Sequence, residues 1–497
     1  MVYHNPIILS DYSDPDVIRY KDSFYLVASS FNHTPIIPIL KSKNLVDFKI
    51  LRYVDDKLPF ERFKDVYHGE GAWAPSIRFN NGKFYIIVPY PDEGVWIYET
   101  DDIECGKFTS WPLIEAKGII DPCPIWTGDK CYMVIGFAKS RIGFNSVLGL
   151  YEVTPDLKRV VSDSYKIIYD GHNNNPTIEG PKFYYRNNYF YILAPAGSVK
   201  AGWQTALRSK DIYGPYESKI VMLQNDSKVN GPHQGALVDL EDGCDVFYHF
   251  QDLGPYGRVL HLQEVNWIND WPIIGEVKDP LLAGTPEERH EYFIDQKSNY
   301  KIQTSDEFNE NAISLMWQTP ANKGDNWFKP TNEGLVLNCV PNESKALNEV
   351  PNSLLTKIAF KSFIVNTKVE LNLINESDEA GLTYMGREYA YISVILKDNK
   401  KYIRLYTGSF NNKDTIIKEI EYNSNEIIFS LKYIYPNNYY LGYNGFYFED
   451  EFIATPGRWI GGKYGIFAKG DKFGGSAKYK YFRVEENESK WRIYIRH

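Results

Sequence analysis

The sequence predicts an all-β protein in which a five-bladed β-propeller is followed by a β-sandwich domain. The first half repeats a short strand-rich unit, the pattern changes near residue 300, and no stretch keeps the apolar spacing of a helix. Aromatic residues make up 15% of the chain, led by 39 Tyr and 27 Phe, which favours strands over helix bundles. A length of 497 residues exceeds what one core usually holds, so two domains are expected.

The repeat is centred on an apolar run that reads FYLVASS, FYIIVPY, CYMVIGF, FYILAPA and VFYHFQD in turn. Its centres lie 47 to 60 residues apart and are Tyr25, Tyr85, Tyr132, Tyr191 and Phe247. A period near 50 that is built of short β segments and turns is typical of propeller blades.

Each repeat offers four strand candidates. In the first repeat they cover residues 15–19, 24–29, 37–42 and 48–53, with turn-forming residues between them. Five such units fill residues 5 to about 290, so we predict a propeller domain over residues 1–290.

The second domain follows a polar, turn-rich linker at residues 278–302. Segments such as LTYMG, YAYISVIL, YIRLYTGSF and YYLGYNGFYFE then alternate in polarity, which predicts a β-sandwich over residues 303–497. This domain is expected to be structural or to contribute one loop to a neighbouring site. Asp306 and Glu307 fit either a solvated acidic turn or a structural calcium site.

The composition argues against several classes of protein. A net charge of −9 disfavours nucleic acid and anionic membranes as partners. The five cysteines lack CxxC spacing and are interpreted as reduced thiols. The opening MVYHNPIILSDYSDPD has neither a basic nor an apolar leader segment, which predicts a cytoplasmic enzyme; a secreted protein whose leader has been removed would look the same.

Ionisable residues recur at one place in the repeat. Counting back 11 to 14 residues from the centres reaches Asp14, Ala74, Asp121, Glu179 and His233. The first strand of every blade lines the channel of a propeller, so these side chains should converge on one pocket, walled by Trp73. Collecting buried carboxylates is costly unless they differ in proton affinity and are hydrogen-bonded, so catalysis explains them better than stability does.

Hydrolysis of a glycosidic bond needs two carboxyl groups, one as an acid for the leaving oxygen and one as a base or nucleophile. Trp73 and Phe31 flank channel positions and offer apolar faces for a sugar ring. Arg258 is a candidate donor to sugar hydroxyls, with a structural ion pair as the alternative.

These motifs resemble glycoside hydrolase family 43. The resemblance is carried by NPIILSDYSDPDVIRYKDSFYLVASSF, GAWAPSIRFNNGKFYI, IIDPCPIW, TIEGPKFYYRNNYFYI, RSKDIYGPYE, GPHQGAL and YGRVLHLQEVNW, in order over residues 5–280. It implies a five-bladed propeller that hydrolyses β-D-xylosides, α-L-arabinofuranosides or arabinans with inversion, usually from the chain end. The C-terminal part resembles the concanavalin-like sandwich attached to many β-xylosidases and arabinofuranosidases of that family.

The resemblance also implies roles for single residues. Asp14 is the general base, Glu179 the general acid, and Asp121 tunes the proton affinity and position of that acid. Inversion requires the two catalytic carboxyls to lie roughly 6.5–9.5 Å apart, against about 5–5.5 Å for retention. Asp16 should lie on the same side as Asp14 by strand alternation, and its role is left open.

Other channel residues keep more than one interpretation. His233 could hydrogen-bond within the channel, hold a divalent cation, since relatives bind calcium near this histidine, or be a buried core imidazole. Gln234 is a candidate substrate contact. For Asp14, Asp121 and Glu179 the alternative is a turn-capping carboxylate, because an acid before proline often marks a turn.

The sequence thus predicts an exo-acting, inverting enzyme of xylan degradation that releases a terminal pentose. The partner is a xylo- or arabino-oligosaccharide, with β-D-xylosidase activity favoured over α-L-arabinofuranosidase activity. No cofactor is needed for the chemistry; a structural Ca²⁺ and a homo-oligomer are left open. The alternatives are an endo- or exo-arabinanase, a retaining hydrolase, and a non-catalytic carbohydrate-binding propeller.

Overall fold

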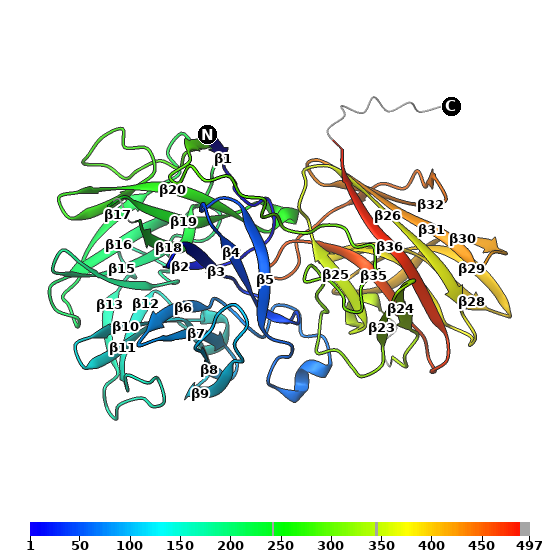
Figure 1. Cartoon of the computed structure of the whole chain (residues 1–497), viewed down its shortest axis with the longest axis horizontal. Coiled ribbons are helices and arrows are strands. Elements are labelled where there is room, and N and C mark those ends of the chain that lie inside the picture. Colours follow the sequence, from blue (N-terminus) through cyan, green and yellow to red (C-terminus); the bar gives the residue numbers. More distant parts are fainter. Residues whose placement is uncertain (241–242, 343–345, 488–497) are drawn as a thin grey trace. The chain divides into compact units, whose positions relative to one another are not determined.

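The computed structural model describes residues 1–240, 243–342 and 346–487. The chain divides into two compact units, one made of Met1–Phe63 and Tyr67–Ile302, the other of Lys64–Val66 and the chain from Gln303 onward. Figure 1 shows strands throughout both units. The all-β class is confirmed.

The first unit holds five antiparallel sheets of four strands, each in simple up-and-down order. The first sheet contains β2 (Asp16–Tyr20), β3 (Ser23–Val27), β4 (Ile36–Ser42) and β5 (Phe48–Asp55), and the second β6 (Ser76–Asn80), β7 (Lys83–Tyr90), β8 (Gly94–Thr100) and β9 (Thr109–Glu115). The third contains β10 (Ile119–Thr127), β11 (Lys130–Phe137), β12 (Val147–Val153) and β13 (Lys166–Asp170), and the fourth β14 (Lys182–Arg186), β15 (Tyr189–Ala196), β16 (Trp203–Ser209) and β17 (Glu217–Met222). The fifth contains β18 (His233–Asp239), β19 (Asp245–Asp252), β20 (Arg258–Ile268) and β21 (Trp271–Ile274). The four strands expected in the first repeat are therefore present, within two residues at each end.

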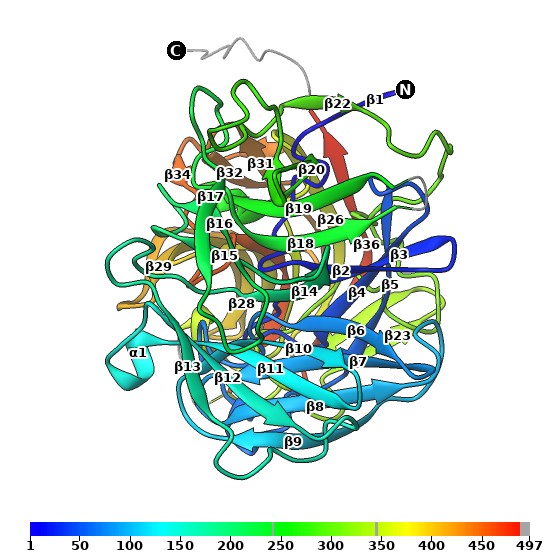
Figure 2. The ribbon, with the colours of Figure 1, turned by 90° about the vertical axis from the view of Figure 1, so that its left-hand side faces the viewer.

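These sheets form a ring of blades. Five buried apolar clusters each join two successive blades, and one of them joins the fifth blade to the first, for example through Leu260 and Leu262 with Leu26 and Leu40. The first strands β2, β6, β10, β14 and β18 lie side by side around the centre (Figure 2). Because the apolar side chains pack between blades, the channel at the centre is left to polar groups.

The ends of the propeller are held together by the N-terminal segment. Strand β1 (Val2–His4) pairs with β22 (Arg289–Glu291), and Ile8 forms a bridge with Leu260 of β20. The Asn5 side chain bonds the backbone of Leu262 through both its oxygen and its nitrogen, each at 2.9 Å. The segment that leads to Asp14 is thereby fixed to the fifth blade.

The second unit is a sandwich of two antiparallel sheets. One contains β23 (Phe328–Thr331), β24 (Gly334–Asn338), β36 (Ser476–Glu486), β26 (Phe363–Asn372), β31 (Glu426–Ile434), β32 (Asn438–Tyr443), β33 (Phe446–Tyr447) and β34 (Phe452–Ile453). The other contains β25 (Ser353–Lys357), β35 (Lys463–Lys469), β27 (Glu379–Met385), β28 (Glu388–Lys397), β29 (Lys400–Ser409) and β30 (Asn412–Tyr422). The Tyr479 hydroxyl reaches across the core to the carbonyl oxygens of Gly381 and Phe467, at 3.0 and 2.7 Å.

Helical structure among the described residues is confined to α1 (Lys139–Ile142) and the 3₁₀ turns η1 (Glu61–Lys64), η2 (Gly254–Tyr256) and η3 (Leu347–Glu349). Within the described ranges no helix is long and apolar enough to cross a lipid bilayer.

The acidic pair at the start of the sandwich makes internal contacts. The Asp306 carboxylate accepts hydrogen bonds from the Trp317 indole and the Phe308 amide, both at 2.9 Å. Glu307 forms a two-point ion pair with Arg483, at 2.8 Å for each contact. These contacts fit the acidic turn, and a structural calcium stays a prediction.

Candidate active site

Each blade presents two consecutive residues to the channel just before or at the start of its first strand. The first of the two is defined by a backbone contact with the second strand: Ser29 N with Ser13 O (3.0 Å), Trp73 N with Pro89 O (3.0 Å), and Glu179 N with Pro195 O (3.1 Å). Ile120 pairs in the same way with Gly136, and His233 with Phe250. The first channel position is therefore occupied by Ser13, Trp73, Ile120, Glu179 and His233, and the second by Asp14, Ala74, Asp121, Gly180 and Gln234.

This pairing corrects the alignment made from the sequence. Asp14, Ala74 and Asp121 are equivalent, as expected, but Glu179 and His233 stand one residue earlier in their blades. Counting from the strand centres assumes a constant spacing, and the fourth and fifth blades do not keep it. The candidate acid thus enters the channel from the same position as Trp73 and His233.

The second channel position has a left-handed backbone in four blades. The φ angle is 56° at Asp14, 54° at Asp121, 56° at Gly180 and 38° at Gln234. The strand register slips at this point in the third and fifth blades. Such bulges re-aim side chains and cost about 1–3 kcal/mol for each strained non-glycine residue. The ring accepts this cost at the residues that carry the chemistry.

Asp14 is clamped through both carboxylate oxygens. Ser29 Oγ donates to Oδ2 at 2.6 Å, and Arg258 Nη1 donates to Oδ1 at 2.9 Å. The Arg258 amide in turn donates to Asp11 Oδ1 at 2.9 Å, and the Tyr12 amide donates to the Arg258 carbonyl at 3.1 Å. Residues from the two ends of the propeller therefore hold Asp14 in one orientation.

Arg258 takes the second of its two expected roles in this structure, since its guanidinium pairs with a carboxylate. The side chain is 12% exposed and also lies 4.9 Å from the centre of the Phe250 ring. A contact of Arg258 with the substrate stays a prediction. Ser29 was missed by the sequence reasoning; its only signal is its position opposite Ser13 at the end of β3.

Asp121 is buried between the fourth and fifth blades' channel residues. The Gly180 amide donates to Oδ2 at 2.8 Å, and the Gln234 side-chain amide lies 3.4 Å from Oδ1. Burial, followed by the charges of Glu179 and Asp14, raises the pKa of Asp121 to about 7. The three candidate carboxyls therefore interact, as the sequence predicted.

Gly180 cannot be replaced without moving this arrangement. Its backbone is left-handed, and a Cβ at this position would lie 2.7 Å from the Gln234 side-chain carbon. Glycine adopts this conformation at little steric cost. The motif Glu179-Gly180-Pro181 thus places an acid directly before an amide that binds Asp121.

Glu179 is the most open of the candidate carboxyls. Its side chain is 35% exposed, against 7% for Asp14, and its Oε1 lies 3.1 Å from His233 Nε2. His233 is fully buried against Phe250, with ring centres 5.4 Å apart. Of the interpretations of His233, the hydrogen bond within the channel is the one present. No group of three or more His, Cys, Asp or Glu in the described ranges could hold a metal ion, so a metal at His233 stays a prediction.

Phe31 and Trp73 form an aromatic corner between the first two blades. Their ring centres lie 5.9 Å apart at 59°, and Phe31 forms a two-way backbone bridge with Ala72 at 2.8 and 2.9 Å. A Cβ on Gly71 would lie 2.3 Å from the Phe31 carbonyl oxygen, so glycine is required there. The Arg141 guanidinium, paired with Asp92 at 3.2 Å, covers Trp73 at 5.0 Å.

Comparison with known families decides what this ring of carboxyls belongs to. The sequence profile of glycosyl hydrolases family 43 matches residues 3–272, and that of the β-xylosidase C-terminal concanavalin A-like domain matches residues 305–485. The chain belongs to glycosyl hydrolase family 43. The resemblance noted in the sequence is confirmed, and the match covers every channel residue described above.

Named relatives within family 43 include two that differ in their substrates. A putative β-xylosidase from Xylanibacter ruminicola is 37% identical over 351 residues, which are 68% of this chain and 63% of that protein. A non-reducing end α-L-arabinofuranosidase from Bacteroides ovatus is 25% identical over 458 residues, 86% of this chain and 82% of that protein. The match thus spans less than two thirds of the length of the Xylanibacter relative.

Solved family 43 structures share the fold. The crystal structure of xylan β-1,4-xylosidase from Bacillus halodurans superposes with a TM-score of 0.83 at 20% identity, over 97% of this chain and all of that one. A propeller with a C-terminal sandwich is therefore confirmed for both parts of the chain.

Proposed function

We propose that this protein is an exo-acting, inverting glycoside hydrolase that releases a terminal pentose from xylo- or arabino-oligosaccharides, with β-D-xylosidase activity foremost. The observation that carries the proposal is the meeting of three carboxyls in different surroundings. Asp14 is clamped and nearly buried, Asp121 is buried with a raised pKa, and Glu179 is open beside His233.

Single displacement needs one carboxylate to activate water and one carboxylic acid to protonate the leaving oxygen. In the proposed reaction Asp14 takes a proton from water as the water oxygen bonds to the anomeric carbon. The bond from that carbon to the glycosidic oxygen breaks, and Glu179 gives its proton to the departing oxygen. The clamp of Ser29 and Arg258 suits Asp14 to the first role, because it fixes the lone pairs that must face the water.

The acid must carry its proton near neutral pH. Interacting carboxyls release their protons in steps that belong to the set, and the raised pKa of Asp121 means that the set keeps one proton up to about pH 7. In the proposed working state that proton resides on Glu179, the carboxyl open to substrate. All groups in these steps are carboxyls of the chain, so the proposal invokes no cofactor.

The pentose assignment is supported by the relatives, whose names specify β-xylosidase and non-reducing end α-L-arabinofuranosidase. The aromatic corner of Phe31 and Trp73 supplies an apolar face of the kind on which sugar rings pack. Neither observation separates the two pentoses, so the substrate needs a direct test.

A substrate panel tests the proposal. We expect kcat/KM for nitrophenyl β-D-xyloside to be highest, nitrophenyl α-L-arabinofuranoside to follow, and nitrophenyl β-D-glucoside to be at least about 100-fold lower, because a hexose adds a hydroxymethyl group to a pentose-sized site. Xylo-oligosaccharides should yield only xylose. Faster turnover of the glucoside, or oligomers released from linear arabinan, would contradict the assignment, and binding without turnover would favour a carbohydrate-binding propeller.

The stereochemistry gives a separate prediction. Proton NMR of the first product formed from a β-D-xyloside should show α-xylose, with the β anomer growing only as mutarotation proceeds. A water between base and substrate attacks the face opposite to the leaving group, which produces this inversion. If β-xylose forms first, Asp14 acts as a nucleophile and the assignment of a general base is wrong.

A further inference from the structure

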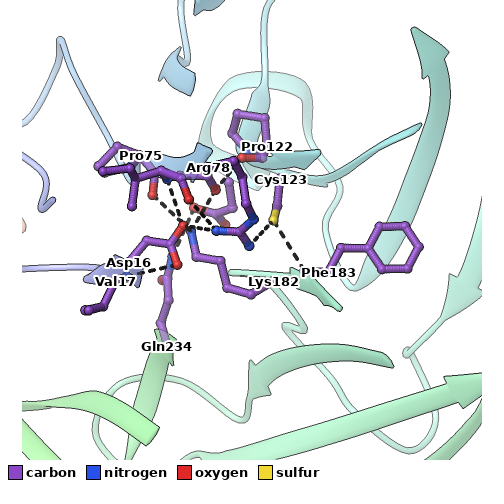
Figure 3. A network of polar contacts seen from close by, with 12 residues as sticks. Asp16, Val17, Pro75, Arg78, Pro122, Cys123, Lys182, Phe183 and Gln234 are labelled. Carbon is purple, nitrogen blue, oxygen red and sulfur yellow. Dashed lines mark hydrogen bonds and ion pairs between the residues drawn. The ribbon is translucent and has the colours of Figure 1, made fainter. Parts of the chain in front are cut away.

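A buried group of charges lies deeper in the channel than the candidate carboxyls. We call it the axial charge cluster; its members are Asp16, Arg78, Cys123 and Lys182 (Figure 3). Asp16, Cys123 and Lys182 each stand two residues after the second channel position of their blades, and Arg78 follows in the second blade. Four first strands, β2, β6, β10 and β14, thus contribute one member each.

Asp16 is the only carboxylate of this cluster. Its Oδ2 accepts from Arg78 Nη1 at 2.7 Å and from the Ile77 amide at 2.9 Å, and lies 3.8 Å from Lys182 Nζ. The Asp16 and Lys182 side chains are both fully buried. The role that the sequence left open for Asp16 is therefore an ionic one, beneath the site.

Lys182 is held by neutral acceptors. Its Nζ donates to the Pro75 carbonyl and to Ser76 Oγ, both at 2.9 Å. Arg78 Nη2 donates to Cys123 Sγ at 2.8 Å. With a thiol at Cys123, two cations face one carboxylate, and the cluster carries one net positive charge.

A net charge without water is costly unless opposite charge lies near. Lys182 follows Gly180, whose amide binds Asp121, by two residues on the same strand. The excess positive charge therefore lies directly behind the candidate carboxyls, which carry net negative charge. The two groups offset each other's cost of burial.

We propose that the axial charge cluster sets the working protonation state of the catalytic carboxyls, with Lys182 and Asp16 as positioning residues of opposite sign. This proposal rests on the proposed glycosidase function. It predicts that charge removed from either residue moves the pH dependence of catalysis, in a direction given by the sign of the lost charge.

The surroundings of Asp121 support this assignment. Burial and the charges of Glu179 and Asp14 raise its pKa, whereas the Gly180 amide and the Lys182 charge lower it. The other charged or titratable groups facing the carboxyls are Arg258, Asp11, Asp252 and His233, and those facing the cluster include Tyr184. None of these is altered by substitutions at residues 16 and 182.

The test is a charge cycle with Lys182→Met, Asp16→Asn and the double variant. Loss of Lys182 removes a positive charge, so carboxyl protons bind more tightly and both limbs of the kcat/KM–pH profile should move up by about half a pH unit or more. Loss of Asp16 should move both limbs down by a similar amount. The double variant restores the net charge and should return the profile close to that of the wild type.

Controls separate charge from packing. Lys182→Arg keeps the charge and should keep the profile. Asp245→Asn removes another fully buried carboxylate, paired with Arg186 at 2.8 Å in the propeller, and should lower thermal stability without moving the profile. If one single variant does not fold, the other single variant compared with the double variant measures the same charge.

The outcomes are distinct. Shifts of the same sign at both positions, or none in folded variants, would overturn the cluster's proposed role while leaving glycosidase activity established. An inactive wild-type protein on every sugar of the substrate panel would instead remove the proposed function itself.

Discussion

Glu179→Gln is expected to lower kcat for xylobiose by about 10²–10⁴-fold. The amide keeps the shape of Glu179 and its contact with His233 but has no acidic proton for the glycosidic oxygen. The loss should depend on the leaving group, because dinitrophenolate departs without protonation. We therefore expect a much smaller loss, within about tenfold, on dinitrophenyl β-D-xyloside.

Comparing the two substrates makes this experiment sharp. The exposed Asp22, which pairs with Lys43 on the first blade, provides a surface control as Asp22→Asn and should change neither rate. An equal loss on both substrates would show that Glu179 does not act as the acid. Unchanged rates would return the carboxyl to the turn-capping role that the sequence left as its alternative.

Asp14→Asn should have a comparably large effect with the opposite dependence on substrate. We expect kcat to fall by about 10²–10⁴-fold on both xylobiose and the dinitrophenyl glycoside, because every substrate needs an activated water. Azide needs no base and should partly restore turnover of the dinitrophenyl glycoside, with an α-configured xylosyl azide as the product. A β-configured azide, or no loss of rate, would contradict a general base at Asp14.

This substitution also removes the carboxylate from a clamp. Arg258 Nη1 then loses its ion-pair partner, so the folded state should be confirmed by circular dichroism and thermal melting before rates are compared. A stable variant with the expected loss assigns the effect to chemistry. An unstable one shows how strongly the clamp joins the two ends of the ring.

Most of the blade architecture could be predicted from local patterns. Turn-forming residues between short apolar runs locate the strands of the first blade to within two residues, because strand and turn preferences are properties of neighbouring residues. The recurrence of acids before proline or glycine likewise identified Asp14, Asp121 and Glu179, which interact in the structure.

The alignment of those acids was less predictable. Strand alternation and constant spacing place Glu179 level with Asp14, whereas backbone pairing places it level with Ser13 and Trp73. The left-handed backbone at Asp14 and Asp121 breaks the alternation, and neither residue type announces such a conformation. Only the paired strands show how the bulges turn successive side chains toward the channel.

The sequence by itself determined the family, the ring of four-stranded blades followed by a sandwich, and the three acids of the candidate site. The tertiary structure decided their partners: Arg258 on Asp14, His233 on Glu179, and Arg78 with Lys182 around Asp16. The reason is distance along the chain. A strand is specified by its neighbours, but a contact between residues 14 and 258 exists only once the last blade closes on the first.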